Sequence, residues 1–328
     1  MGKKFTIGVL IGNVHTAHPK DLMRGIRAAA SGMDVNVIYF LGTQSVRFNQ
    51  KFALEDFDYQ YNTVYDYAKL AKVDVLIIAY GSLCIFQKNE DKQAFLDKFA
   101  GIPYVLLEDA TDDPRGIYVM VDNFGGMQKC VEHLIIEHHL KHLVYLGGPE
   151  DNQDAIERKA AFLNVMAEHH LPVTPEMMAV GDYSEFVDNL VEQLLKDNPD
   201  AEAIISANDE MTVACYRVCK AHGLRIGKDI LITGFDDVER ARYSNPPLTT
   251  ASQDAYKMGQ IAVEKAVDIC AGRPVESVRL DAELIIRESC GCKVTRRAKE
   301  KADERDIEEQ LVKHVTRYLL EMGNGFAF

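Results

Sequence analysis

The sequence predicts an α/β protein made of two doubly wound parallel-sheet lobes followed by a C-terminal helix. Short β-branched runs alternate with amphipathic stretches from residue 5 onward, an alternation typical of repeated βα units. The alternation comes in two successive series. A chain of 328 residues is also longer than one core usually fills, roughly 250 to 300 residues, so two compact domains are expected.

The first series contains apolar, β-branched runs that predict buried parallel strands at 5–11, 35–41, 74–79 and 103–107. A helix is predicted at 19–31, because apolar side chains recur there at helical spacing. Pro19 can begin this helix, since the first turn does not need its missing N–H. These units predict the first sheet and one of its covering helices.

The second series predicts strands at 117–122, 142–146, 203–206 and 230–234. Asp122 can cap the helix that follows the first of these strands. Gly223 can end another helix, which begins at Asn208, because glycine readily adopts the left-handed conformation common after a helix C-terminus. The series therefore predicts a second sheet with its own helices.

The C-terminal segment changes character at Arg296, where a charged run begins that contains no Gly or Pro until Gly323. Apolar residues recur in it at spacings of four, four, three and four, which predicts one long helix. About two heptads are few for an independent coiled coil. The apolar stripe could pair with a second copy or dock on its own body, and pairing into a homodimer is slightly favoured.

Composition and charge limit the partners and the compartment. A formal net charge of -13 opposes binding to nucleic acid through the whole surface, because that affinity comes largely from Lys and Arg. No apolar run has the length of a membrane span, and the apolar start lacks a signal-peptide cleavage site. Seven scattered Cys fit a reducing compartment. We expect a cytoplasmic protein with no membrane contact.

Common catalytic motifs are absent from the sequence. No G-x-G-x-x-G follows the first strand, and no G-x-x-x-x-G-K-[ST] occurs, so neither common phosphate-binding loop is present. The G-x-S-x-G elbow of α/β hydrolases is also missing. The sequence therefore predicts neither an enzyme nor a cofactor.

Two histidines and two cysteines are candidate metal ligands. His133 and His138 lie near the end of one predicted helix, but five positions separate them. This spacing does not place both on one helix face, as the spacing of four in zinc-binding helices does. Favourable interaction with the helix dipole is the preferred role for them, and no metal site is predicted. For Cys290 and Cys292, which flank one glycine, a redox or metal role stays open beside a structural role.

Several segments, in this order, resemble the sensor core of the lactose- and galactose-repressor family (LacI/GalR type). They are IGVLI from Ile7, LMRGI from Leu22, VDNFGG from Val121, HLVYLGGP from His142, ANDEM from Ala207, ITGFDD from Ile232, PPLTT from Pro246 and RES from Arg287. The resemblance covers about residues 5 to 290. It implies the type I periplasmic binding protein-like fold, with a ligand between two lobes.

The resemblance also implies the domain boundaries. One lobe would contain residues 5–121 with 254–276, and the other residues 122–253 with 277–292. Residues 293–328 would form a helical signalling tail. Ligands of such folds bind beyond the carboxyl ends of parallel strands, so the site is expected in the cleft between the lobes.

Candidate ligand-binding residues follow from the resemblance position by position. Arg158 stands where the family holds ligand oxygens, a role suited to its fork of donors. Asn208, Asp236 and Gln253 match positions that bind ligand hydroxyls, and Tyr183 matches an aromatic that faces the ligand. The wall from the first lobe would consist of Asn13, Val14, His15, Tyr80 and Glu108. Helix capping by Asn208, a turn at Asp236 and core packing of Tyr183 are the alternative roles.

The largest departure from a repressor is that the sensor core starts at residue 5, without the helix-turn-helix head. We therefore expect a cytoplasmic sensor domain for a sugar-like small molecule, part of a transcriptional or signalling regulator. Its output would pass through the C-terminal helix, with a possible output domain after residue 328. A transport-type sugar-binding protein is the alternative. An enzyme using acidic residues of the cleft is the third and least favoured hypothesis.

Overall fold

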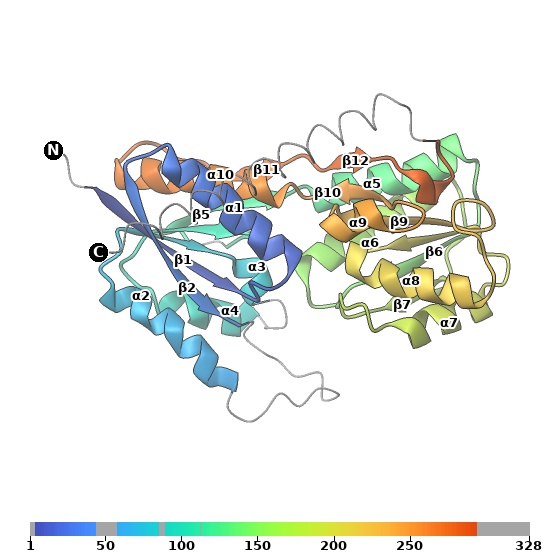
Figure 1. The fold of residues 1–328 in the computed structure, drawn as a ribbon, viewed down its shortest axis with the longest axis horizontal. Helices are drawn as coiled ribbons and strands as arrows, with labels where there is room; N and C mark the ends of the chain where they lie inside the picture. Colours follow the sequence, from blue (N-terminus) through green and yellow to red (C-terminus); the bar gives the residue numbers. More distant parts are fainter. Residues whose placement is uncertain (1–3, 44–57, 85–88, 112, 294–328) are drawn as a thin grey trace, which may run out of the picture.

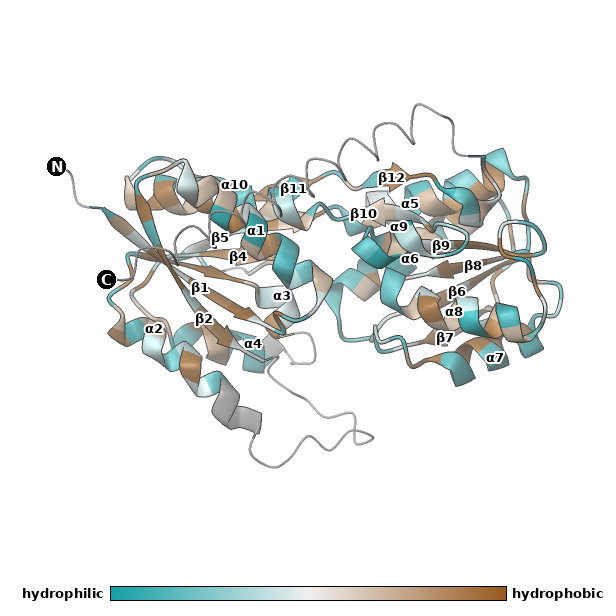
Figure 2. Cartoon of the chain, viewed as in Figure 1, coloured by the Kyte–Doolittle hydropathy of each residue, from teal (hydrophilic) through white to brown (hydrophobic). Residues whose placement is uncertain are grey.

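The computed structural model describes residues 4–43, 58–84, 89–111 and 113–293. They form two lobes, each built around a six-stranded sheet (Figure 1). Apolar strands lie inside each lobe and amphipathic helices cover both faces, as the hydropathy colouring of Figure 2 shows. No helix in this part of the chain is long and apolar enough to cross a membrane.

The sheet of the first lobe is parallel throughout and has the strand order β11-β5-β4-β3-β1-β2. Its strands are β1 (Phe5–Gly12), β2 (Val35–Gly42), β3 (Val75–Ile78), β4 (Tyr104–Leu107), β5 (Gly116–Val121) and β11 (Val278–Leu280). Its helices are α1 (Ala17–Ser31), η1 (Asp58–Asp66), α2 (Tyr67–Leu70), α3 (Tyr80–Leu83), α4 (Asn89–Asp97) and α10 (Ala255–Cys270). Helices α1 and α10 pack side by side on one face of the sheet (Figure 1).

The sheet of the second lobe has the order β12-β10-β9-β8-β6-β7, in which only β12 is antiparallel to its neighbour. Its strands are β6 (Leu143–Gly147), β7 (Met178–Val180), β8 (Ala203–Ser206), β9 (Leu231–Asp236), β10 (Thr249–Ser252) and β12 (Glu283–Ile285). Its helices are α5 (Asn123–Glu132), the π-helix η2 (His133–Glu137), α6 (Gln153–Glu168), η3 (Pro175–Met177), α7 (Asp188–Asp197), α8 (Asp209–Ala221), α9 (Glu239–Tyr243) and η4 (Glu288–Cys290).

Three chain segments cross between the lobes, after β5, after β10 and after β11. The first and third lie together, because the backbone N–H of Asp122 donates to the carbonyl of Leu280 at 2.7 Å. The Asp122 side chain then accepts from the backbone N–H of Gly125 and caps α5, as predicted. A hinge of three short connections permits the two lobes to move relative to each other.

The eight predicted strands are present, with ends that differ from the prediction by at most two residues. The predicted boundary at residue 277 is wrong by about four residues, because β11 still pairs with β5 in the first sheet. The chain enters the second sheet only at β12. The predicted tail helix after residue 293 lies outside the described residues.

The expectation that His133 and His138 lie on different helix faces is also wrong. It assumed α-helical geometry, but the helix widens into a π-helix at His133–Glu137. Hydrogen bonds in a π-helix join residues five apart, so residues with that spacing lie above one another. The two Nε2 atoms are 3.3 Å apart.

Candidate functional site

A cavity of about 940 Å³ lies between the two lobes. The first lobe lines it with the loop after β1, the first turn of α3 and the end of β4. The second lobe contributes the starts of α6 and α8, the segment 183–186, the end of β9 and helix α9. Most of these are carboxyl ends of parallel strands and the helix starts that follow them, where ligands of open α/β sheets bind. Its volume is in the range of small-molecule sites.

Arg158 lies in α6 at the floor of this cavity, with only 2% of its surface exposed. Its Nε donates to Oδ1 of Asn123 at 2.9 Å, and its Nη1 donates to the carbonyl of Ala207 at 2.7 Å. The guanidinium carbon lies 3.8 Å from the centroid of the Phe235 ring. Nη2 is buried and has no hydrogen-bond partner among the described residues. Arg158 therefore has a fixed plane and one donor nitrogen left for a ligand.

Two carboxylates flank this arginine. Asp154, one helical turn earlier in α6, has an oxygen 3.7 Å from Nη2 of Arg158. Burial raises the pKa of Asp154 to about 6, although the charge of Arg158 lowers it in part. Asp236, at the end of β9, accepts from Nε2 of Gln253 at 2.5 Å and lies 3.5 Å from Nη1 of Arg158. Burial raises the pKa of Asp236 as well. The floor therefore presents a donor between two acceptors.

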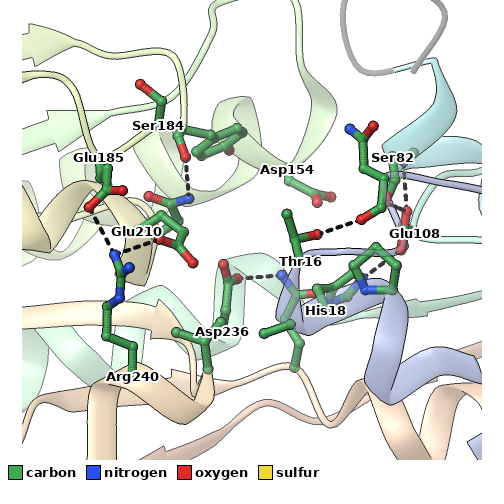
Figure 3. Close-up of a pocket in the computed structure, with 18 of the residues that line it drawn as sticks. Thr16, His18, Ser82, Glu108, Asp154, Ser184, Glu185, Glu210, Asp236 and Arg240 are labelled. Carbon is green, nitrogen blue, oxygen red and sulfur yellow. Dashed lines mark hydrogen bonds and ion pairs between the residues drawn. The ribbon is translucent and has the colours of Figure 1, made fainter. Parts of the chain in front are cut away.

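The wall from the first lobe is organised by Glu108, which is buried at the end of β4. Its carboxylate accepts from the backbone N–H of Ser82 at 2.6 Å and from the Ser82 hydroxyl, and it lies 2.6 Å from Nε2 of His18 (Figure 3). Burial alone would raise the pKa of Glu108, but His18 and Ser82 lower it below its usual value. Burial alone would lower the pKa of His18, but Glu108 raises it. The two side chains therefore form a partly buried ion pair when His18 is protonated.

Asn208 and Tyr183 are tied to each other across the wall from the second lobe. Asn208 caps α8, because its Oδ1 accepts from the backbone N–H of Met211 at 3.0 Å. Its Nδ2 donates to the carbonyl of Tyr183 at 3.2 Å. The Tyr183 hydroxyl donates to Oδ1 of Asn152 at 3.2 Å. Asn208 thus has the capping role given above as an alternative, and it also lines the cavity.

The structure brings eight of the ten predicted residues to the cavity: Arg158, Asn208, Asp236, Gln253, Tyr183, Asn13, His15 and Glu108. Val14 and Tyr80 are not among the lining residues, which corrects the prediction. Val14 packs against the core beneath α1 and α10. Tyr80 begins α3, and its ring is buried in the core on the other face of the sheet. Gly81 and Ser82 of the same turn reach the cavity instead.

Several lining residues were missed by the sequence analysis. Asp154 precedes Arg158 by four positions in α6, so helical spacing could have found it. His18, in contrast, lies in the first turn of α1, after the loop that contains His15. Arg240 bridges Glu185 at 3.0 Å and Glu210 at 3.3 Å (Figure 3). No sequence pattern connects these last three residues, which lie in different loops and helices.

The chain resembles known regulators in sequence. A family described as a periplasmic binding protein-like domain matches residues 131–290. The HTH-type transcriptional regulator CelR of Thermobifida fusca is 30% identical over 216 residues, which cover 63% of this chain and 62% of CelR. The chain thus spans less than two thirds of that relative's length.

Solved structures share the fold. A complex of the transcriptional regulator CelR with cellobiose has a TM-score of 0.72 at 23% identity, covering 88% of this chain and 85% of that chain. A lac repressor dimer bound to operator and the anti-inducer ONPF has a TM-score of 0.73 at 23% identity, covering 88% and 82%. These likenesses establish the type I periplasmic binding protein-like fold that the sequence predicted.

Proposed function

We propose that this chain is a periplasmic binding protein-like sensor domain of the lactose-repressor type, and that it binds a hydroxylated small molecule in the interlobe cavity. The buried Nη2 of Arg158 has no hydrogen-bond partner among the described residues and only a longer ion-pair contact with Asp154, and this observation carries the proposal. A buried donor without an acceptor costs about 1–3 kcal/mol, and more when it is charged. A ligand oxygen beside Arg158 would accept this bond, while Asp154 and Asp236 would accept from ligand hydroxyls.

The charge of the cavity favours a neutral ligand. Its described lining residues include six carboxylates and two arginines: Glu108, Asp154, Glu185, Glu210, Asp236 and Glu239, with Arg158 and Arg240. Arg240 is already paired with two of these carboxylates. Glu108 is paired with His18, so a phosphorylated or carboxylated ligand would meet repulsion from Asp154, Asp236 and Glu239. Neutral sugars and nucleosides, which carry many hydroxyls, fit this environment best, and Tyr183 offers a ring to stack on them.

The output of the sensor would come from lobe closure. A ligand that contacts both walls favours the closed arrangement of the lobes over the open one. In a homodimer, closure would change the relative position of the two copies, and residues 293–328 would carry the change to the output part of a cytoplasmic transcriptional or signalling regulator. The repressor of like fold cited above is a dimer, which supports this arrangement.

A thermal-shift screen tests the binding proposal. Neutral sugars, nucleosides, nucleobases and sugar phosphates would be added to the wild type, to Arg158→Met and to Arg217→Met. Arg217 is a matched control, because it lies on the same lobe in an exposed ion pair. We expect a neutral compound to raise Tm by about 2–4 °C at saturating concentration in the wild type and in Arg217→Met only. No shift from any compound would contradict the proposal.

A further inference from the structure

Four potential metal ligands converge at the outer end of the second lobe, away from the interlobe cavity. They are His133, His138, Cys290 and Cys292, whose ligand atoms all lie within 4.8 Å of one another. The histidines come from the end of α5 and its π-helical extension η2, and the cysteines from the turn around η4. Figure 1 shows this turn, drawn in red, beside the end of α5.

The π-helix explains why the two histidines meet. In α-helical geometry, a spacing of five would turn His138 well away from His133. The π-helical hydrogen bonding of residues 133–137 brings residues five apart onto the same face of the helix instead. The two rings are 5.0 Å apart between centroids, and both present Nε2 to the same point. Single π-turns inside helices are often found at functional sites.

The two cysteines are held by the backbone around them. Gly291, between them, has a φ of +85°, a conformation that glycine adopts without strain, and it turns the chain back. Ser289, the residue before Cys290, is held in place by two hydrogen bonds. Its hydroxyl donates to the carbonyl of Ile232 at 2.6 Å, and its N–H donates to the carbonyl of Pro247 at 2.9 Å. Cys290 is fully buried and Cys292 is partly exposed. The thiols are therefore positioned by the fold.

Four of the six separations between the ligand atoms match a tetrahedral metal site, and the other two are at most 4.8 Å. Zinc bound at about 2.0–2.1 Å to nitrogen and about 2.3 Å to sulfur places its ligand atoms roughly 3.3–3.8 Å apart. Nε2 of His133 lies 3.3 Å from Sγ of Cys290 and 3.6 Å from Sγ of Cys292. Nε2 of His138 lies 3.4 Å from Sγ of Cys292 and 3.3 Å from Nε2 of His133. An ion could enter with little rearrangement.

We propose that His133, His138, Cys290 and Cys292 bind a Zn²⁺ ion. Two thiolates with two imidazoles are a donor set that selects zinc, and four protein ligands leave no open position for catalysis. The site is therefore structural. It joins the end of the first helix of the second lobe to the turn that precedes residue 293.

Metal analysis of the full chain tests the proposal. The reduced protein would be loaded with ZnCl₂, dialysed, and assayed for zinc by mass spectrometry beside Cys292→Ser, His138→Asn and the control His139→Asn. His139 is exposed, adjacent in sequence and not part of the cluster. We expect one zinc per chain in the wild type and in the control, and a loss of most of it in the other two variants. Co²⁺ in place of zinc should give the intense visible bands of a tetrahedral thiolate site.

Two results would overturn the proposal: a reduced wild type that retains no zinc, or cluster variants that retain as much as the wild type. Circular dichroism would check that each variant is folded. If a cluster variant does not fold, the wild type alone decides, since zinc removal by a chelator should lower its Tm and added zinc should restore it. A Tm that is equal with and without zinc would count against the site.

Discussion

The guanidinium of Arg158 stacks on the ring of Phe235, 3.8 Å from the ring centroid, at the floor of the interlobe cavity. Such a cation–π contact contributes about 0.5–2 kcal/mol, more when it is shielded from water. Two other nitrogens of Arg158 bind Asn123 and Ala207. Together with the stack, these bonds fix the orientation of the guanidinium and therefore the direction in which Nη2 can donate to a ligand. Preorganisation of this kind lowers the entropy lost when a ligand binds.

Replacing Phe235 by Leu is expected to weaken ligand binding, because Arg158 loses the surface that fixes its plane. The free energy of unfolding should also fall, by about 1–2 kcal/mol. The control is Phe162→Leu, in which the lost ring stacks on Tyr145 in the same lobe. This control should lose similar stability with no change in affinity, as measured by urea unfolding and calorimetric titration. Equal affinity in both variants would argue against the role of Phe235.

Ligand affinity is expected to fall as the pH drops below about 6. Asp154 has a pKa of about 6 because of burial, so its carboxylate gains a proton in this range and no longer accepts from a ligand hydroxyl. The dissociation constant should rise between about pH 7 and pH 5 in the wild type and change less in Asp154→Asn. The same pH dependence in both proteins would exclude Asp154 as the titrating group.

The ion pair of His18 and Glu108 should give stability a defined pH window. The raised pKa of His18 means that its contribution is complete below 6.5 and is lost as the pH rises through the raised value. The lowered pKa of Glu108 means that its contribution is complete above 4.5 and is lost as the pH falls through the lowered value. The pair therefore stabilises the first lobe most between 4.5 and 6.5.

Urea unfolding of the wild type and His18→Gln at several pH values checks this window. The difference in free energy of unfolding between the two proteins should be larger at about pH 6 than at about pH 9. A difference that does not depend on pH would mean that His18 remains neutral beside Glu108.

Helices α1 and α10 approach each other closely at Gly25. A Cβ added there would lie 1.9 Å from the carbonyl oxygen of Tyr256, so Gly25→Ala must push the helices apart. We expect the free energy of unfolding to fall by about 1–3 kcal/mol. Gly32→Ala, at the end of the same helix, is the control, because its Cβ would lie 3.6 Å from the nearest atom at a negative φ. Thermal unfolding of both variants should show a loss of stability only for Gly25→Ala.

The sequence predicted the strands well, because strands buried on both faces are continuous apolar runs with little ambiguity. The caps at Asp122 and Asn208 were predicted for a similar local reason, since one side chain meets one backbone N–H three residues later. Features that depend on geometry beyond the local pattern were missed. The π-turn at His133 leaves no signature in residue type, and the bridge from Arg240 to Glu185 and Glu210 joins segments far apart in the chain.

The candidate site was predicted in part for the same physical reasons. Residues that follow a strand reach the cavity, but which side chain points inward depends on how the turn begins. At β3, helix α3 starts at Tyr80 itself, so that ring enters the core and Ser82 faces the cavity. His18 and Asp154 lie on helix starts, one in the first turn of α1 and the other one turn before Arg158 in α6, and neither position belongs to an apolar stripe.

Calorimetric titration of the best neutral ligand from the screen into the wild type and Arg158→Lys tests the central claim most directly. Lysine keeps the charge but lacks the planar fork, so it cannot bind Asn123, Ala207 and a ligand oxygen together. The account predicts one ligand per chain in the wild type and an affinity at least about tenfold lower in Arg158→Lys, as expected for the loss of a charged hydrogen bond. Equal affinities in the two proteins would contradict it.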